Sequence, residues 1–213
     1  MPLPDPLPLL TRAPVIPVLT IERVADAVPL ARALVAGGLP VLEVTLRTGA
    51  AVDAIAAITR EVPDAVVGVG TVTKPDDLQT AIAIGAQYVV SPGTPLQLAE
   101  ALGQVQVPAV PGCATVSEAM ALAARGFKVL KFFPAEASGG TAWLEAVAAP
   151  LPGLHFCPTG GIDANNAGAY LVLSNVVAVG GSWVAPKDAI TAGDFSRITA
   201  LAREAAGLRK RRN

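Results

Sequence analysis

The chain has 213 residues, of which 52% are hydrophobic, 4% aromatic and 15% charged, and its formal net charge at pH 7 is −1. This length suits one sizeable core, and the small net charge gives no overall field that would favour nucleic acid or an anionic membrane as a partner. Two cysteines without a CxxC pair and a single histidine make a disulfide framework impossible and a zinc site improbable, so we expect buried thiols in a cytoplasmic protein.

The two ends of the chain differ in composition from the rest. Residues 1–13 are rich in proline and lack the basic segment and helical apolar core of a signal peptide. Residues 207–213 are basic and have the character of a frayed tail. We therefore expect an N-terminal extension over 1–13, one domain over 14–206 and a C-terminal tail over 207–213. Long uncharged stretches such as 164–186 are interrupted by Asn, Ser and paired glycines, so no membrane span is expected.

Between these ends, short β-branched segments alternate with alanine-rich segments. The pattern predicts strands at 15–19, 41–46, 66–71, 87–91, 107–110, 127–133, 154–157 and 176–179. It predicts helices at 23–36, 51–60, 76–84, 96–102, 117–125, 143–148 and 164–173, with a last helix ending near Ala206. About eight strand-then-helix units predict an α/β fold with a parallel sheet, closed as a single-domain (β/α)8 TIM barrel.

A doubly wound open sheet is the alternative arrangement of the same units. Such a fold normally carries a glycine-rich turn after its first strand. Here the first strand is followed by Thr20-Ile21-Glu22-Arg23, which weakens that alternative.

Lys131 is a charged residue inside an otherwise apolar strand. Removing its ammonium group from water costs on the order of several kcal/mol, so it needs an acidic partner or a role as an amine nucleophile. Alternation along the strands places Lys131 on an inward face, and it places Glu43 inward on the second strand with Arg47 just beyond it. Parity alone leaves a structural ion pair open, whereas the additional cation of Arg47 favours a site that binds a carboxylate.

Paired glycines end the last two predicted strands. They are Gly160-Gly161 after the seventh strand and Gly180-Gly181, followed by Ser182, after the eighth. Glycines let backbone N–H groups approach an anion, and these two strand ends commonly build a phosphate site in barrels. Their positions indicate a phosphorylated ligand.

Two segments resemble the signatures of a known family. Segment 38–47 (Gly-Leu-Pro-Val-Leu-Glu-Val-Thr-Leu-Arg) and segment 131–136 (Lys-Phe-Phe-Pro-Ala-Glu) are similar to those of the 2-keto-3-deoxy-6-phosphogluconate (KDPG) and 4-hydroxy-2-oxoglutarate aldolases. The likeness extends from about residue 14 to 206. It implies a class I aldolase that cleaves KDPG reversibly to pyruvate and glyceraldehyde 3-phosphate, and that also cleaves 4-hydroxy-2-oxoglutarate to pyruvate and glyoxylate.

The resemblance implies a catalytic role for several residues. Lys131 would form the Schiff base, and Glu43 would be the general acid and base. Arg47 and Thr71 would bind the carboxylate end of the pyruvyl group. Pro92 and Phe133 would line the same part of the site.

At the other end of the substrate, the resemblance implies a phosphate pocket of Gly160, Gly161 and Ser182, with Gly181 also contacting the substrate. Thr159 would face the hydroxyl groups of the sugar acid. Its presence favours the gluconate substrate over the galactonate epimer.

The resemblance further implies no cofactor and no metal, because the imine polarises the substrate as a metal otherwise would. The expected partners are small molecules, namely pyruvate and a phosphorylated aldehyde or sugar acid, and further copies of the chain in a homotrimer. Two other readings stay open: a phosphosugar isomerase or epimerase with Glu43 as base, and a sugar-phosphate-binding barrel that has lost catalysis.

Overall fold

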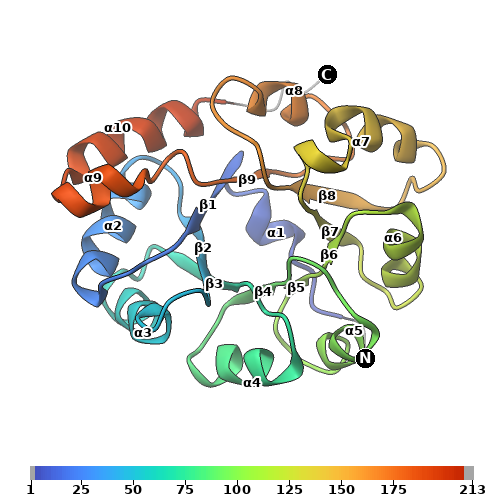
Figure 1. The fold of residues 1–213 in the computed structure, drawn as a ribbon, viewed down its shortest axis with the longest axis horizontal. Helices are drawn as coiled ribbons and strands as arrows, with labels where there is room; N and C mark the ends of the chain where they lie inside the picture. The colour runs from blue at the N-terminus through green and yellow to red at the C-terminus, as the bar shows by residue number, and fades with distance from the viewer. Residues whose placement is uncertain (1–2, 209–213) are drawn as a thin grey trace.

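The computed structural model describes residues 3–208, in which parallel strands alternate with helices (Figure 1). The strands are β1 (Val15–Leu19), β2 (Val41–Thr45), β3 (Val66–Gly70), β4 (Tyr88–Val90), β5 (Ala109–Val110), β6 (Gly112–Cys113), β7 (Val129–Phe132), β8 (His155–Pro158) and β9 (Val179–Gly181). The helices are α1 (Leu7–Leu10), α2 (Val24–Ala36), α3 (Ala51–Glu61), α4 (Pro75–Ala83), α5 (Leu96–Leu102), α6 (Val116–Ala123), α7 (Gly140–Ala148), α8 (Ala167–Leu171), α9 (Lys187–Ala192) and α10 (Phe195–Ala206), with a 3-10 turn η1 (Glu136–Ser138). None of the helices within the described range is both long enough and apolar enough to cross a membrane.

The strands form two parallel sheets instead of one closed barrel. Six strands pair in the order β5-β4-β3-β2-β1-β9, and three pair in the order β6-β7-β8. Between β8 and β9, the pairing within residues 3–208 consists of isolated bridges at Phe156–Val176 and Thr159–Gly180. The prediction of a closed eight-stranded (β/α)8 TIM barrel is therefore wrong, although the parallel α/β character is confirmed.

Pro111 lies at the other junction between the sheets. β5 pairs with β4 through Val110, and β6 pairs with β7 through Gly112. Proline has no N–H group and cannot donate a hydrogen bond to a strand ladder, so the chain passes from one sheet to the other at this residue.

The last strand also differs from its prediction. The sequence predicts a strand at 176–179, whereas β9 begins at Val179 and pairs with β1 through Val15 and Val179. The apolar residues that suggested the strand lie mostly before it, and the two glycines that suggested a turn complete it. A buried parallel pair accepts glycine here because the backbone supplies the ladder hydrogen bonds.

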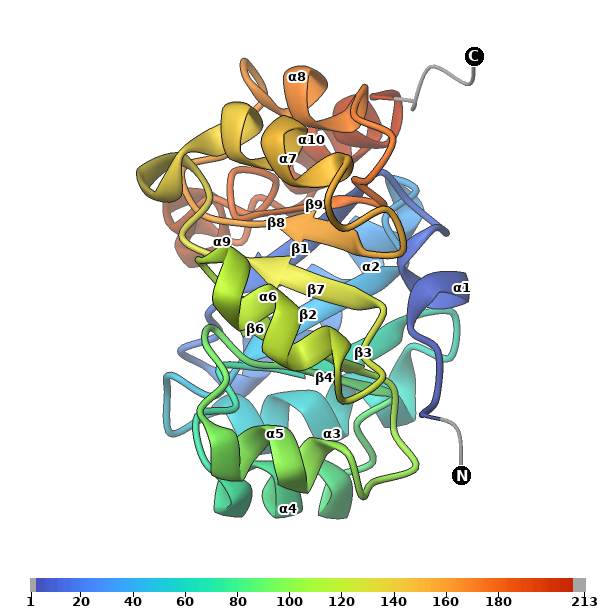
Figure 2. The same ribbon diagram turned by 90° about the vertical axis from the view of Figure 1, so that its right-hand side faces the viewer.

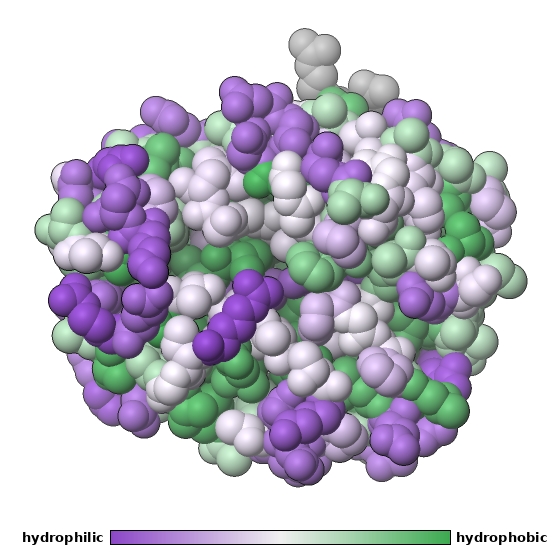
Figure 3. Space-filling model, viewed as in Figure 1, coloured by the Kyte–Doolittle hydropathy of each residue, from purple (hydrophilic) through white to green (hydrophobic). Residues whose placement is uncertain are grey.

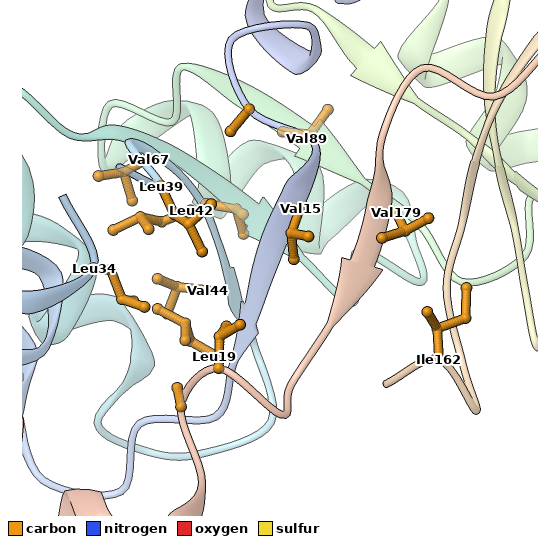
Figure 4. Packing of buried hydrophobic residues seen from close by; sticks show 14 of the residues in the cluster. Val15, Leu19, Leu34, Leu39, Leu42, Val44, Val67, Val89, Ile162 and Val179 are labelled. Carbon is orange, nitrogen blue, oxygen red and sulfur yellow. The ribbon is translucent and has the colours of Figure 1, made fainter. Parts of the chain in front are cut away.

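Side chains alternate between two apolar clusters. Leu42 and Val44 of β2 belong to the cluster between the strands and the helices, where Figure 4 shows them on the same side as Leu34 of α2. Val41 of β2 and Val129 of β7 belong to the second cluster, which we call the inner cluster because its strand residues alternate with those that face the helices. The predicted parity is thereby confirmed for β2 and for β7 from Val129 onward.

Helix α1 covers one end of the inner cluster. Leu10 is 1% exposed and belongs to that cluster, and Leu7 packs against it. In Figure 2 the β7 arrow points to the left, toward the carboxyl ends of the strands, and α1 lies at the right. Helix α1 therefore lies at the amino ends of the strands. The carboxyl ends of the strands are therefore the end at which a site can be open to solvent.

Candidate active site

Lys131 of β7 and Glu43 of β2 meet between the two sheets. Lys131 Nζ donates a hydrogen bond of 2.9 Å to Glu43 Oε1, and the side chains are only 4% and 5% exposed. Breaking such a pair would leave an uncompensated buried charge, which is strongly unfavourable. Both residues lie where alternation along the strands predicted, and the structure joins them.

Gly70 of β3 provides the space for the Glu43 carboxylate. A Cβ atom at residue 70 would lie 2.4 Å from Glu43 Oε1, closer than non-bonded atoms approach. Gly70 pairs with Thr45 in the β2–β3 ladder, so the clearance is built into the strand register. Sequence reasoning assigned Gly70 no role.

The Lys131 amine also lies near an aromatic ring. Its Nζ atom is 5.5 Å from the centroid of Phe133, within the range of a cation–π contact. Phe133 therefore lies beside the Lys131 side chain.

Arg47 and Thr71 lie together beyond the ends of β2 and β3. Arg47 Nε donates a hydrogen bond of 3.1 Å to Thr71 Oγ1. Thr71 has a φ of 62°, a left-handed conformation that costs a β-branched residue about 1–3 kcal/mol. Such strain is found mostly where the backbone is held for binding or catalysis, and here it directs the hydroxyl toward the exposed Arg47 guanidinium.

A pocket of about 230 Å³ opens above Lys131 at the carboxyl ends of the strands. Figure 3 shows this face of the molecule with a hollow near its middle. Eight of the residues predicted for the site line the pocket: Arg47, Lys131, Phe133, Thr159, Gly160, Gly161, Gly181 and Ser182.

The other three predicted residues lie outside this lining. Glu43 accepts a hydrogen bond from Lys131, and Thr71 accepts one from Arg47, so each of them contacts a residue that lines the pocket. Pro92 does not line the pocket, and its backbone instead packs against Gly112, where a Cβ atom would lie 2.4 Å from the Pro92 carbonyl carbon.

Gly160 and Gly161 form one wall of the pocket. Their φ angles are 101° and 77°, values that side chains rarely adopt. Within residues 3–208, neither glycine N–H donates a hydrogen bond to a protein acceptor, so both are free to bind an anion. Thr159 precedes them at 6% exposure, and Gly180 leaves room for its hydroxyl, because a Cβ atom there would lie 2.2 Å from Thr159 Oγ1.

Thr20 lines the pocket but was not predicted. It follows β1, and its Oγ1 lies 3.3 Å from Thr45 Oγ1, which in turn donates to the Leu19 carbonyl. Val18, Ile162 and Gly180 also line the pocket without having been predicted. Thr20 follows a strand, where site residues of such folds lie, but a threonine after a strand is too common to indicate a binding residue.

The thiol nearest to Lys131 is not poised to act as a nucleophile. Cys157 lies beside Lys131 in the β7–β8 ladder, and burial, with the Glu43 charge adding to it, raises the pKa of its thiol to about 12. A thiol of this kind is a poor nucleophile. Across the described residues, no group of three or more His, Cys, Asp or Glu side chains could hold a metal ion.

Comparison with known proteins gives consistent matches over nearly the whole chain. A sequence model of the family described as KDPG and KHG aldolase matches residues 8–201. The 2-dehydro-3-deoxy-phosphogluconate aldolase of Dickeya dadantii is 53% identical over 197 residues, which cover 92% of each chain.

Solved structures give the same result. The KDPG aldolase of Legionella pneumophila, with pyruvate captured as a covalent carbinolamine intermediate, has a TM-score of 0.93 at 43% identity, over 95% of this chain and 98% of the other. The 2-keto-3-deoxy-6-phosphogluconate aldolase of Zymomonas mobilis ZM4, with 3-phosphoglycerate, has a TM-score of 0.90 at 44% identity, over 96% and 97% of the two chains.

Proposed function

Because the chain belongs to the KDPG and KHG aldolase family, we propose that it cleaves 2-dehydro-3-deoxy-6-phosphogluconate reversibly to pyruvate and glyceraldehyde 3-phosphate. The observation that carries the proposal is the buried contact between Lys131 and Glu43 beneath a pocket lined by free glycine amides. An amine nucleophile, an adjacent proton acceptor and an anion site are the three parts that such a reaction needs.

Lys131 begins the reaction as a nucleophile. Its neutral amine attacks the C2 ketone, and loss of water gives a protonated imine. Glu43 is the nearest carboxylate, 2.9 Å from Lys131 Nζ, and takes the proton of the C4 hydroxyl directly or through a water molecule. The C3–C4 bond breaks, its electron pair moves into the imine to give the enamine, and glyceraldehyde 3-phosphate leaves.

The second half of the reaction reverses these roles. Glu43 returns a proton to C3 of the enamine, and water hydrolyses the resulting imine to free pyruvate and Lys131. The imine draws the electron pair by itself, so the proposed cycle assigns no step to a metal or cofactor.

The two ends of the substrate occupy different parts of the site in this proposal. Arg47 and Thr71 bind the carboxylate of the pyruvyl part, since a guanidinium can bind a carboxylate through two hydrogen bonds. Phe133 packs against the pyruvyl carbons, and Pro92 adds to this wall when substrate is bound.

The phosphate end lies against the loops after β8 and β9. Gly160 and Gly161 supply backbone N–H groups, Gly181 lines the same side of the pocket, and the exposed Ser182 adds a hydroxyl. Thr159 faces the hydroxyl groups between the two ends, which supports the gluconate over the galactonate epimer.

A second substrate is 4-hydroxy-2-oxoglutarate, which gives pyruvate and glyoxylate. The family name joins the two activities, and the pyruvate enamine is common to both. The comparisons do not favour the isomerase, epimerase and non-catalytic alternatives, because the relatives reported above are named as aldolases.

We also propose that the protein is a cytoplasmic homotrimer. Large apolar side chains are exposed on several helices and their ends, among them Leu96 at 58%, Met120 at 55% and Val172 at 60%. Contacts between copies would remove such surface from water. Light scattering tests the assembly, and a mass of one chain would reject it.

Trapping with borohydride tests the central step. Reduction in the presence of pyruvate should add one pyruvyl group, and peptide mapping should place it on Lys131. Lys128, three residues earlier in the same segment, is the internal control. An unmodified protein, or modification at another lysine, would reject the proposed chemistry.

A further inference from the structure

Glu136 belongs to the signature segment 131–136, yet it has no part in the chemistry proposed above. It lies in η1 after β7, and its Oε1 accepts a hydrogen bond from the hydroxyl of Tyr170 in α8. Tyr170 is 1% exposed. Burial raises the pKa of this hydroxyl and the Glu136 acceptor raises it further, so the tyrosine remains a hydrogen-bond donor near neutral pH.

Glu136 also supports the glycine wall of the pocket. Its backbone N–H donates a hydrogen bond of 3.1 Å to the carbonyl of Gly160. Its methylene groups pack against Gly161, where a Cβ atom would lie 2.6 Å from Glu136 Cγ. One residue therefore contacts both glycines, through its backbone and through its side chain.

Asn166 holds the same two-residue segment from the other side. Its Nδ2 donates a hydrogen bond of 2.9 Å to the Gly161 carbonyl, and its Oδ1 accepts one from the backbone of Asp163. Both glycine carbonyls are thus occupied by protein donors. Their N–H groups are the part of the segment that remains for an anion.

We infer that Glu136 and Tyr170 are positioning residues, which hold Gly160 and Gly161 in the conformation that binds the substrate phosphate. The inference rests on the proposed function. The Tyr170 hydroxyl fixes the Glu136 side chain, and the Glu136 side chain fixes the glycine segment. The same hydrogen bond also directs the Glu136 carboxylate toward α8, which reduces its repulsion of a phosphate group.

The test compares a phosphorylated substrate with its unphosphorylated analogue. Tyr170→Phe keeps the buried ring and removes the hydroxyl. We expect its KM for 2-dehydro-3-deoxy-6-phosphogluconate to rise about tenfold with little change in kcat, because a hydrogen bond to a charged group is lost at the supporting residue. Cleavage of 2-dehydro-3-deoxygluconate and borohydride labelling with pyruvate, which do not use the phosphate wall, should stay unchanged.

Glu136 gives an independent version of the test at an exposed position. Glu136→Gln keeps the methylene groups and a carbonyl acceptor, so it should retain most of the affinity for the phosphorylated substrate. Glu136→Ala removes the acceptor and the side chain beyond Cβ. It should raise the KM for the phosphorylated substrate at least as much as Tyr170→Phe does. Should Tyr170→Phe fold poorly, the two Glu136 variants decide the question.

Tyr88→Phe is the matched control. Tyr88 is also fully buried, but its hydroxyl has no hydrogen-bond partner within residues 3–208. Removing this hydroxyl should therefore leave unchanged the ratio between the KM values for the phosphorylated and the unphosphorylated substrate. The inference would be overturned if the Tyr170 and Glu136 variants raised KM equally for both substrates, or raised it for neither. Absence of a pyruvate adduct in the unmodified protein would instead reject the proposed function itself.

Discussion

Lys131 and Glu43 are 88 residues apart in the chain, yet Lys131 Nζ lies 2.9 Å from Glu43 Oε1 and both side chains are almost fully buried. This contact joins the two sheets, because Lys131 lies on β7 and Glu43 on β2. It therefore has a part in stability as well as in the proposed chemistry, and the two parts can be separated by substitution.

Glu43→Gln should lower kcat by about 10²–10⁴-fold, because it removes the proton acceptor and keeps the size of the side chain. Steady-state rates with KDPG measure the effect, and circular dichroism checks that the fold is intact. Turnover within a few fold of the original protein would exclude Glu43 from proton transfer.

Lys131→Met should destabilise the protein by about 3–5 kcal/mol and abolish activity, because the Glu43 carboxylate is left buried without its partner. Adding Glu43→Gln to this variant should recover much of the lost stability, since both charges are then absent. Urea unfolding of the single and double variants measures the coupling. Lys128→Met, at an exposed position, is the control. Additive effects of the two site substitutions would contradict the expected coupling.

Gly70→Ala should reduce activity more than it reduces stability. The added methyl group would lie 2.4 Å from Glu43 Oε1 and must displace the carboxylate, while overpacking of this kind costs about 1–3 kcal/mol. Gly153→Ala is the matched control, because no atom lies within 4 Å of its added Cβ. Equal activities in the two variants would show that the Glu43 position tolerates movement.

Stability should fall as the pH rises above about 9. Burial raises the thiol pKa of both Cys113 and Cys157 from 9.0 to about 12. Between these values the unfolded chain has lost protons that the folded chain still holds, so each thiol lowers the free energy of unfolding by up to about 1.4 kcal/mol per pH unit. The contribution of the two protonated thiols to the free energy of unfolding is therefore complete below pH 9 and is lost as the pH rises toward 12.

Urea unfolding at pH 8 and pH 10.5 tests this dependence. The Cys113→Ala/Cys157→Ala variant should lose less stability between the two values than the original protein does. Equal losses would mean that other groups cause the alkaline destabilisation.

Sequence reasoning succeeded where the determining interaction is local. Val41, Glu43 and Thr45 alternate with Leu42 and Val44, and this period of two assigned the faces of β2 correctly. The same alternation on β7 brought Lys131 inward. Alternation along the strands therefore placed these two charged residues on inward faces without a structure.

Sequence reasoning failed where the outcome depends on distant partners. The count of strand–helix units suggested a closed barrel, but the chain passes from one sheet to the other at Pro111. The pairing of β9 with β1 begins only at Val179, the last residue of the predicted strand, and ends two residues beyond it. No local pattern specifies such relationships, because strand pairing depends on hydrogen bonds to segments far away in the chain.

The sequence by itself determined the alternation of strands and helices, the inward faces of the strands and the residue types at their carboxyl ends. These follow from side-chain period and local backbone preference. The tertiary structure decided which strands pair, that two sheets form in place of a closed barrel, and that Lys131 meets Glu43 while Glu136 meets Tyr170. Contacts of this kind depend on how the whole core packs, since they join residues that only folding brings together.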